Sequence, residues 1–311
     1  MLNFNEYASL TDYEMINEKL IIYNGGKKYG QIVFLAGGAG SGKGFARQKF
    51  ISVESFKIRD VDELKLSFQQ LSVLDKFTTK QFMDKYGNNL SEKDRALVQS
   101  EMIDKRIAIS KLDMRNPTHV YLLHMMVKAS GAKEKTLDSM LMGARLGKLP
   151  NILFDITFKD LEEFNRVIPE LIRVGYEPKN IHLTWVLTNY EIAIKNNKLR
   201  PRVVPEDILL ATHRGAAQTV YSLVKNGTPR EIDGSVQVIL NNPENTVAFT
   251  DSSGKPIRNA SGPVVKDFTY LTLKDSGKSA KKEIEIKKQL LMWIRDNTPP
   301  DTLDTSELDK L

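Results

Sequence analysis

The chain has 311 residues, of which 41% are hydrophobic and 27% charged, and its formal net charge is +6. This is ordinary globular composition, and the length allows one large α/β domain or a core with an inserted subdomain. No stretch reaches the roughly 18 uninterrupted apolar residues of a membrane span, and no basic-then-apolar pattern opens the chain, so we expect a cytoplasmic protein. The absence of cysteine excludes disulfides, thiolate catalysis and cysteine-ligated zinc.

The clearest local pattern is an apolar strand followed by a glycine-rich loop. Residues 1–30 carry apolar positions at helical spacing and end in a turn, which predicts a short helix. Residues 32–36 have the length and branching of a buried strand, and residues 37–43 then fit the pattern G-x-x-x-x-G-K. Strand, glycine loop and helix in this order are the context of a phosphate-binding P-loop, or Walker A motif. The alternative is an ordinary glycine turn after a strand.

A P-loop binds phosphate through successive backbone N–H groups, which requires glycines in unusual conformations and a following helix N-terminus. Lys43 would reach the β- and γ-phosphates as a point charge. The predicted nucleotide-binding residues are Gly38, Ala39, Gly40, Ser41, Gly42, Lys43, Gly44 and Phe45.

The residue after the lysine departs from the usual motif. Gly44 stands where a Ser or Thr commonly holds magnesium through its hydroxyl. A Gly-Lys-Gly ending resembles adenylate kinases and other small-substrate P-loop kinases more than GTPases or motor ATPases. Any magnesium would then be held mainly by nucleotide phosphates, water and carboxylates from elsewhere in the chain.

The middle of the chain predicts a helical insertion. A short strand is expected at residues 55–59, after which residues 66–150 have almost no β-branched runs and contain helix-start signals at Ser91 and Thr118. This insertion is longer than a crossover between parallel strands needs, and such a length is typical of a substrate-binding or lid region. The alternative is a set of helices that only covers the sheet.

Core strands resume after the insertion. We expect strands at 151–155, 181–187 and 235–240, a loop at 251–267 and a last short strand at 270–273. Helices are expected between these strands and at 280–295, and the strand–helix–strand spacing implies right-handed parallel crossovers. The predicted fold is a three-layer α/β P-loop domain with a mainly parallel sheet of about five strands. Residues 1–65 and 151–296 form its core, and residues 297–311 a flexible tail.

Carboxylates follow two of the predicted strands. Asp60 and Asp62 come where the second strand ends, at the edge where open α/β sheets place their sites. A carboxylate there can orient and deprotonate an acceptor hydroxyl, whereas the alternative for Asp62 is a helix N-cap. Asp155 ends the third strand in a Walker-B-like arrangement and can hold magnesium through water, or else cap the next helix. Asp60 is a second candidate metal ligand.

A compact basic cluster spans residues 197–202. Arg200 and Arg202 are separated by Pro201, which breaks a helix, so a solvated helix face explains them poorly. Arginines there can close over a γ-phosphate and stabilise the charge that develops in phosphoryl transfer. The four histidines, at positions 119, 124, 182 and 213, show no metal-ligand spacing and are expected to be surface or packed residues.

In this order the motifs resemble the zeta-toxin-like P-loop kinases, which include predicted kinases of tailed phages. The matching segments are residues 37–43, Asp60-x-Asp62-x-Leu64-Lys65, residues 151–157 with their D-x-T ending, and residues 197–205. The resemblance implies that Asp62 is the general base, Lys43 a phosphate ligand, and Arg200 and Arg202 a clamp on the transition state. Gly44 and the long insertion depart from the zeta-toxin pattern.

These patterns predict an ATP-dependent kinase that uses Mg²⁺ and phosphorylates a hydroxyl of an unidentified acceptor. A nucleoside-monophosphate kinase is an alternative that follows from Gly-Lys-Gly. A nucleotide-binding structural or regulatory protein of a larger, phage-type assembly is a third reading, and a protein partner fits it. Nucleic-acid binding is not indicated, because no strong Lys/Arg block with interleaved aromatics occurs.

Overall fold

The computed structural model describes residues 29–304 apart from 53–54, 75–77, 260–261, 276–277 and 280–282, together with Ile21 and Tyr23. The helix expected within residues 1–30 and the last part of the predicted tail, 305–311, lie outside the described residues. No helix in the described part of the chain is both long and apolar enough to cross a bilayer.

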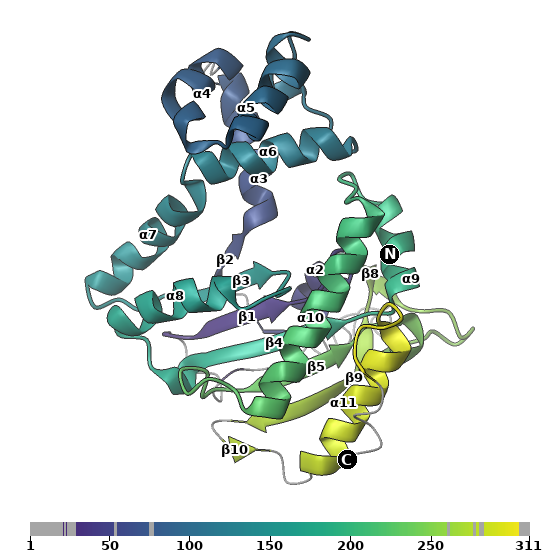
Figure 1. Cartoon of the computed structure of the whole chain (residues 1–311). Coiled ribbons are helices and arrows are strands. Elements are labelled where there is room, and N and C mark those ends of the chain that lie inside the picture. The colour runs from purple at the N-terminus through teal and green to yellow at the C-terminus, as the bar shows by residue number, and fades with distance from the viewer. Residues whose placement is uncertain are drawn as a thin grey trace, which may run out of the picture.

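A central sheet organises the chain (Figure 1). Five strands run parallel in the order β2-β3-β1-β4-β5: these are Phe56–Asp60, Asn151–Ile156, Ile32–Ala36, Ile181–Leu187 and Val236–Leu240. Strand β9 (Val265–Asp275) pairs antiparallel with β5, and β10 (Lys278–Ser279) and β6 (Thr246–Ala248) pair antiparallel with β9. The prediction of a mainly parallel sheet with about five core strands is confirmed.

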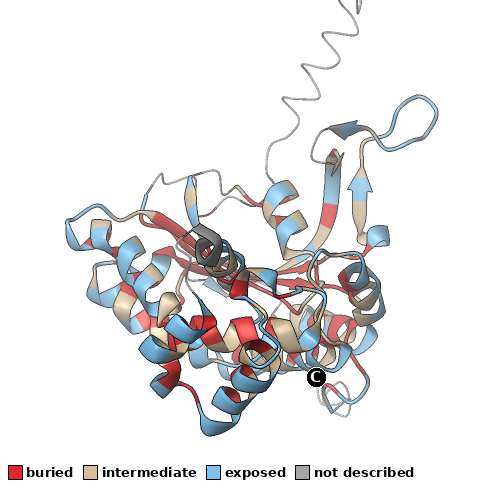
Figure 2. Ribbon diagram, turned by 90° about the horizontal axis from the view of Figure 1, so that it is seen from above, coloured by how far each residue is buried: buried red, intermediate tan, exposed pale blue. Residues whose placement is uncertain are grey.

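Helices cover both faces of this sheet. The α-helices of the described residues, not all of which contact the sheet, are α2 (Lys43–Lys49), α3 (Val61–Leu74), α4 (Thr79–Tyr86), α5 (Glu92–Val98), α6 (Pro117–Ala129), α7 (Ala132–Arg145), α8 (Glu162–Arg173), α9 (Tyr190–Lys198), α10 (Glu206–Asn226) and α11 (Glu283–Asn297). Alternate residues of β1 point into two separate cores: Phe34 packs with α7, α8, α10 and α11, and Val33 packs with α2. The result is the predicted three-layer arrangement, and Figure 2 shows buried residues both on the strands and on the helices.

Helices α3 to α7 follow directly from β2 and include a third core of their own. It is built by Phe82, Leu122, Leu123 and Met126 with their neighbours, and Figure 1 shows α4, α5 and α6 well away from the sheet. Local signals explain these helices: Ser91 caps α5 as expected, and Asn116 caps α6 just before its first residue, a proline. Helices α4, α5 and α6 therefore form a lobe that packs largely on itself, whereas α7 joins the core of the sheet.

The expected loop at 251–267 is partly wrong. It contains the short pair β7 (Arg258–Asn259) and β8 (Gly262–Pro263), and β9 begins within it and runs well beyond the expected 270–273. The second strand likewise extends to Asp60. Strand β9 lies in the outer part of the sheet and carries Lys, Asp and Thr among its apolar residues. Because of this mixture, its sequence lacks the continuous apolar run of a buried strand.

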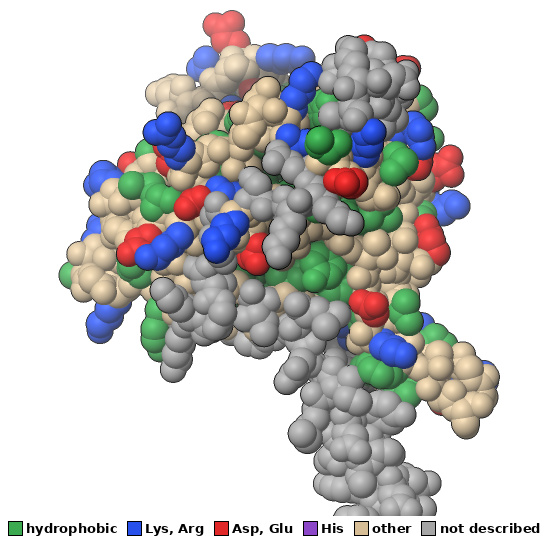
Figure 3. All heavy atoms as spheres, turned by 90° about the horizontal axis from the view of Figure 1, so that it is seen from below, with side chains coloured by type: hydrophobic (Ala, Val, Ile, Leu, Met, Phe, Trp, Pro, Cys, Tyr) green, Lys and Arg blue, Asp and Glu red, His purple; other side chains and the backbone are tan. Residues whose placement is uncertain are grey.

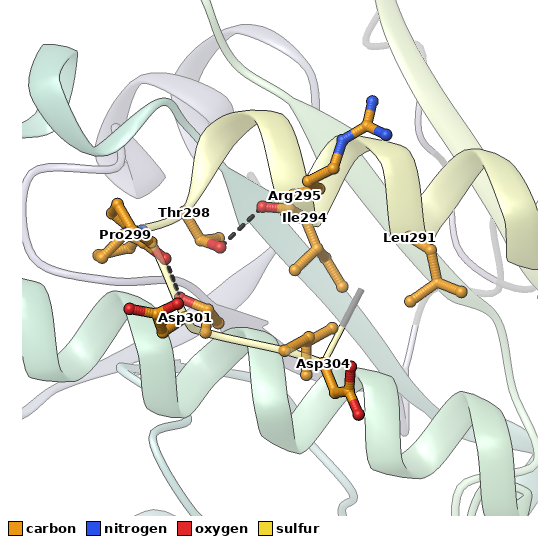
Figure 4. Close-up of a pocket in the computed structure, with 10 residues that line it drawn as sticks. Leu291, Ile294, Arg295, Thr298, Pro299, Asp301 and Asp304 are labelled. Carbon is orange, nitrogen blue, oxygen red and sulfur yellow. Dashed lines mark hydrogen bonds between the residues drawn. The ribbon is translucent and has the colours of Figure 1, made fainter. Parts of the chain in front are cut away.

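The tail prediction is wrong for residues 297–304. Thr298 and Thr302 are buried, and the Gln218 Nε2 atom of α10 donates to the Thr302 carbonyl oxygen over 2.9 Å. This segment returns along α11, and Figure 4 shows a small cavity between the two, with Leu291 and Ile294 on the helix side. Residues 297–304 have the composition of a linker, with two prolines and acidic residues. They are nevertheless held in place by hydrogen bonds from threonine hydroxyls to the backbone and by the bond from α10.

Charged side chains of both signs mix on one face of the molecule. On the face seen in Figure 3, Lys and Arg side chains of the described residues are interspersed with Asp and Glu. Nucleic acids are usually bound by a continuous basic area.

A buried arginine joins β2 to the helices beside it. Arg59 is 1% exposed, donates to Glu163 of α8 over 2.7 Å and to the Lys133 carbonyl oxygen of α7 over 3.2 Å, and lies over the Phe154 ring. Such an ion pair is costly to break, because its loss leaves buried polar groups without partners.

We predict that Arg59→Ala lowers the free energy of unfolding by roughly 3 kcal/mol. Arg166→Ala is the matched control, since Arg166 donates to the same Glu163 oxygen over the same 2.7 Å from a half-buried position. It should cost less than about 1 kcal/mol. Urea unfolding of both variants measures the difference, and equal losses would contradict the structural role of Arg59.

Candidate active site

The glycine loop has the conformation that the motif predicts. It leaves β1 at its buried carboxyl end, and Gly40 and Gly42 have φ angles of 76° and 83°, in the left-handed region that favours glycine. Gly42 is also the N-cap of α2 and provides no side-chain cap. The first N–H groups of α2 therefore point out of the helix without a capping side chain, as phosphate binding requires.

Strand ends hold the loop in place. The Ser41 carbonyl oxygen accepts hydrogen bonds from Thr188 Oγ1 over 2.6 Å and from Asn241 Nδ2 over 2.9 Å. Thr188 directly follows β4 and Asn241 directly follows β5, so both lie at the carboxyl edge of the sheet. Sequence reasoning missed these two residues. A polar residue immediately after each buried parallel strand was the available signal.

Gly44 lies in open space. A side-chain carbon added at this position would have no atom within 4 Å, and the residue is exposed on the first turn of α2. Nothing in the packing therefore requires glycine here. A serine or threonine with its hydroxyl would fit at this position, so packing does not explain why the chain has glycine here.

Lys43 reaches back over the loop toward the third strand. Its Nζ donates to the Gly37 carbonyl oxygen over 2.8 Å and lies 3.6 Å from Asp155 Oδ1. Asp155 and Asp60 are register partners at the ends of β3 and β2. Burial raises the pKa of Asp155 to about 6 against the attraction of Lys43, and the negative charge of Asp60 adds to the rise.

Asp62 is paired with the predicted arginine. The Arg202 guanidinium donates to Asp62 Oδ2, and the Lys65 Nζ donates to Oδ1 over 3.1 Å. Burial opposes ionisation, but Arg202 and Lys65 outweigh it and hold the pKa of Asp62 well below its usual range. The structure thus joins residues 140 positions apart in the chain.

Asp60, not Asp62, has the capping role. Asp60 Oδ1 accepts from the Asp62 backbone N–H over 2.7 Å at the start of α3, whereas Asp62 lies inside the first turn of that helix. The N-cap interpretation of Asp62 is therefore wrong, and its carboxylate is directed to Arg202 and Lys65.

The arginine loop between α9 and α10 is braced from two sides. The Asn197 side chain donates to the Val204 carbonyl oxygen over 2.7 Å and accepts from its N–H over 3.0 Å, and the Val203 N–H donates to the Met114 carbonyl oxygen of the insertion. Arg200 lies in the same loop, but among the described residues it forms no ion pair and does not join the Asp62 group. Asn197, which sequence reasoning placed only in a basic cluster, shapes the loop.

The donor set suits a hard cation only in part. Within the described residues, no group of three or more His, Asp or Glu side chains is placed to hold a metal ion. Asp60 and Asp155 nevertheless lie side by side, and burial together with the negative charge of Asp60 raises the pKa of Asp155 against the attraction of Lys43. Carboxylate oxygens are the ligands that Mg²⁺ prefers. The pair fits a magnesium ion whose remaining ligands are phosphate and water.

Comparison with known proteins gives distant likenesses of fold. No model of a known family matches the chain, and no curated protein matches its sequence. Among solved structures, one of the PezAT chromosomal toxin–antitoxin system of Streptococcus pneumoniae aligns over 95% of this chain and 97% of its own, with 14% identity and a TM-score of 0.36. The AvrRxo1-ORF1:-ORF2 complex with ATP aligns over 96% and 73%, with 12% identity and a TM-score of 0.42.

We predict that Asp155→Asn stabilises the metal-free protein above pH 7 by at most about 3 kcal/mol, because a carboxyl group with a raised pKa favours folding only while it is protonated. The contribution of Asp155 is present below its unfolded pKa and lost as pH rises through about 6. The difference in unfolding free energy between variant and wild type should therefore grow from pH 5 to pH 7.5 in EDTA. A difference that stays constant over this range would contradict the raised pKa.

Proposed function

We propose that this chain is an ATP-dependent kinase that transfers the γ-phosphoryl group to a hydroxyl group of a small acceptor. The observation that supports this most strongly is the pairing of Asp62 with Arg202 at the same sheet edge as the P-loop. A phosphate-binding loop alone fits any nucleotide-binding protein. A carboxylate and a guanidinium beside it add the base and the charge stabilisation that phosphoryl transfer needs.

The P-loop holds the donor in this proposal. Backbone N–H groups of the loop and of the first turn of α2 bind the β- and γ-phosphates, and Lys43 moves from the Gly37 carbonyl oxygen to the phosphate oxygens. Asp60 and Asp155 hold magnesium, the latter through water. When bound, the ion neutralises charge on the phosphates.

Arg202 acts on the transferred group and Asp62 on the acceptor. Arg202 turns from Asp62 to the γ-phosphate, and Arg200 reaches it from the same loop. Losing Arg202 raises the pKa of Asp62 toward its ordinary value, so the carboxylate becomes a better base as the donor binds. The acceptor oxygen then forms a bond to the γ-phosphorus, and the bond to the β–γ bridging oxygen breaks. That oxygen keeps the electron pair in ADP, and the hydroxyl proton passes to Asp62.

The acceptor is bound between the sheet edge and the helical lobe. Lys65 of α3 pairs with Asp62 on the side of the lobe, and Met114 of the lobe meets the arginine loop. A small molecule that enters here reaches Asp62 and the γ-phosphate together, which is the placement that proximity catalysis uses.

We predict that Asp62→Asn lowers the rate of phosphoryl transfer by about 10²–10⁴-fold and leaves the affinity for ATP within a few-fold, because the base acts on the acceptor. The assay follows label from γ-labelled ATP into a small-molecule extract. Lys43→Ala serves as the contrasting variant, and it should weaken ATP binding itself. An Asp62→Asn enzyme as fast as wild type would contradict the base assignment.

Gly44→Ser should restore a magnesium-binding hydroxyl, because open space surrounds this position. We expect the magnesium concentration that gives half-maximal ATP binding to be several-fold lower for this variant than for wild type. Gly44→Ala is the matched control, which removes the same glycine without adding an oxygen and should leave the requirement unchanged. Equal requirements in both variants would place the metal away from residue 44.

A further inference from the structure

Helix α10 contacts the phosphate loop through two consecutive polar side chains. The Ala39 N–H donates to Thr212 Oγ1 over 3.2 Å, and His213 Nε2 lies 2.9 Å from the Ala39 carbonyl oxygen. A carbonyl oxygen only accepts, so His213 Nε2 carries the hydrogen and donates. The Thr212 hydroxyl in turn donates to the Leu209 carbonyl oxygen over 2.7 Å. Both polar groups of the Ala39 residue are therefore bound by one helix.

The contact is closely packed. Thr212 and His213 are 8% and 3% exposed, and a side-chain carbon on Gly38 would lie 2.3 Å from His213 Cδ2. The absence of a side chain at Gly38 is thus what allows the imidazole to lie against the loop. Burial lowers the pKa of His213, with the hydrogen bond to Ala39 opposing the shift.

These bonds divide the loop into two roles. Ala39 is bound by α10, and the Ser41 carbonyl oxygen is bound by Thr188 and Asn241. Gly40 lies between the two fixed points. The Ala39 N–H, which was predicted to bind the nucleotide, is bonded to Thr212, and the Ser41 N–H is bonded to the Gly38 carbonyl oxygen. The N–H groups of the first turn of α2 have no capping side chain and are left for phosphate.

We propose that Thr212 and His213 are positioning residues of the phosphate site: by holding Ala39 they orient the loop N–H groups that bind the nucleotide. The inference rests on the proposed function, because it takes the loop to bind nucleotide phosphates. Neither side chain touches the phosphates. Both act through the backbone of Ala39, and α10 follows directly on the arginine loop, so the same helix holds both parts of the donor site.

The test measures two quantities for each variant, the dissociation constant for Mg·ATP and the free energy of unfolding. His213→Ala and Thr212→Val should each weaken ATP binding by about tenfold, the size expected for one hydrogen bond. His213→Gln should recover most of the affinity, since its amide N–H can donate to the Ala39 carbonyl oxygen.

Two matched controls separate positioning from stability. His182 is a second buried histidine, which lies near the start of β4, away from the phosphate loop, and is hydrogen-bonded to Gln31 and Ser235. Thr298 is a buried threonine whose hydroxyl donates to the Ile294 carbonyl oxygen. His182→Gln and Thr298→Val should lose stability but keep ATP affinity within about twofold of wild type.

Three results would overturn the inference. The first is wild-type affinity in both His213→Ala and Thr212→Val, and the second is an equal loss of affinity in the two controls, which would show that stability alone matters. Either leaves the proposed function standing. The third is a wild-type chain that binds no nucleotide, which would overturn the proposed function as well.

Discussion

The site depends on one constraint, the burial of β1 on both faces. All five residues of this strand are buried between two layers of helices, so the chain leaves the sheet at a dry edge where its backbone polar groups need partners. The glycine loop meets that need through Thr188, Asn241, Thr212 and His213. A loop held this firmly can present its remaining N–H groups to a phosphate without reorganising.

The same edge gathers the charged groups. Strand β3 lies between β1 and β2, and Asp155 near its end is the register partner of Asp60, the last residue of β2. Asp155 in turn lies 3.6 Å from Lys43 Nζ. Helix α3 begins where β2 ends, which places Asp62 on the first turn of α3, before the predicted insertion at 66–150, with its carboxylate paired to Arg202 of the arginine loop. The first turn of α3, from which the helical insertion continues, therefore carries the proposed base, Asp62.

Sequence patterns predicted the parts of this site that are local or ordered along the chain. The P-loop is a short motif between a strand and a helix, and the order of the motifs proposed Asp62 and Arg202 for one site but did not predict that the two side chains pair. The residues that hold the loop were not predicted. Asn197 and His213 bond to backbone carbonyl oxygens, and the partner of such a bond depends on the packed structure and leaves no spacing in the sequence. Thr188 and Asn241 had a positional signal directly after a strand, but their shared partner, the Ser41 carbonyl oxygen, did not. Strand β9 and residues 297–304 were missed for a similar reason, since tertiary contacts order segments whose composition is typical of loops.

The central claim is that donor binding moves Arg202 from Asp62 to the γ-phosphate. A crystal structure with a non-hydrolysable ATP analogue and Mg²⁺ tests it most directly. We predict the β-phosphate against the N–H groups of Gly40 and the first turn of α2, Arg202 on the γ-phosphate, and Asp62 released from Arg202. A nucleotide bound elsewhere, or Arg202 still on Asp62 with the γ-phosphate in the loop, would contradict it.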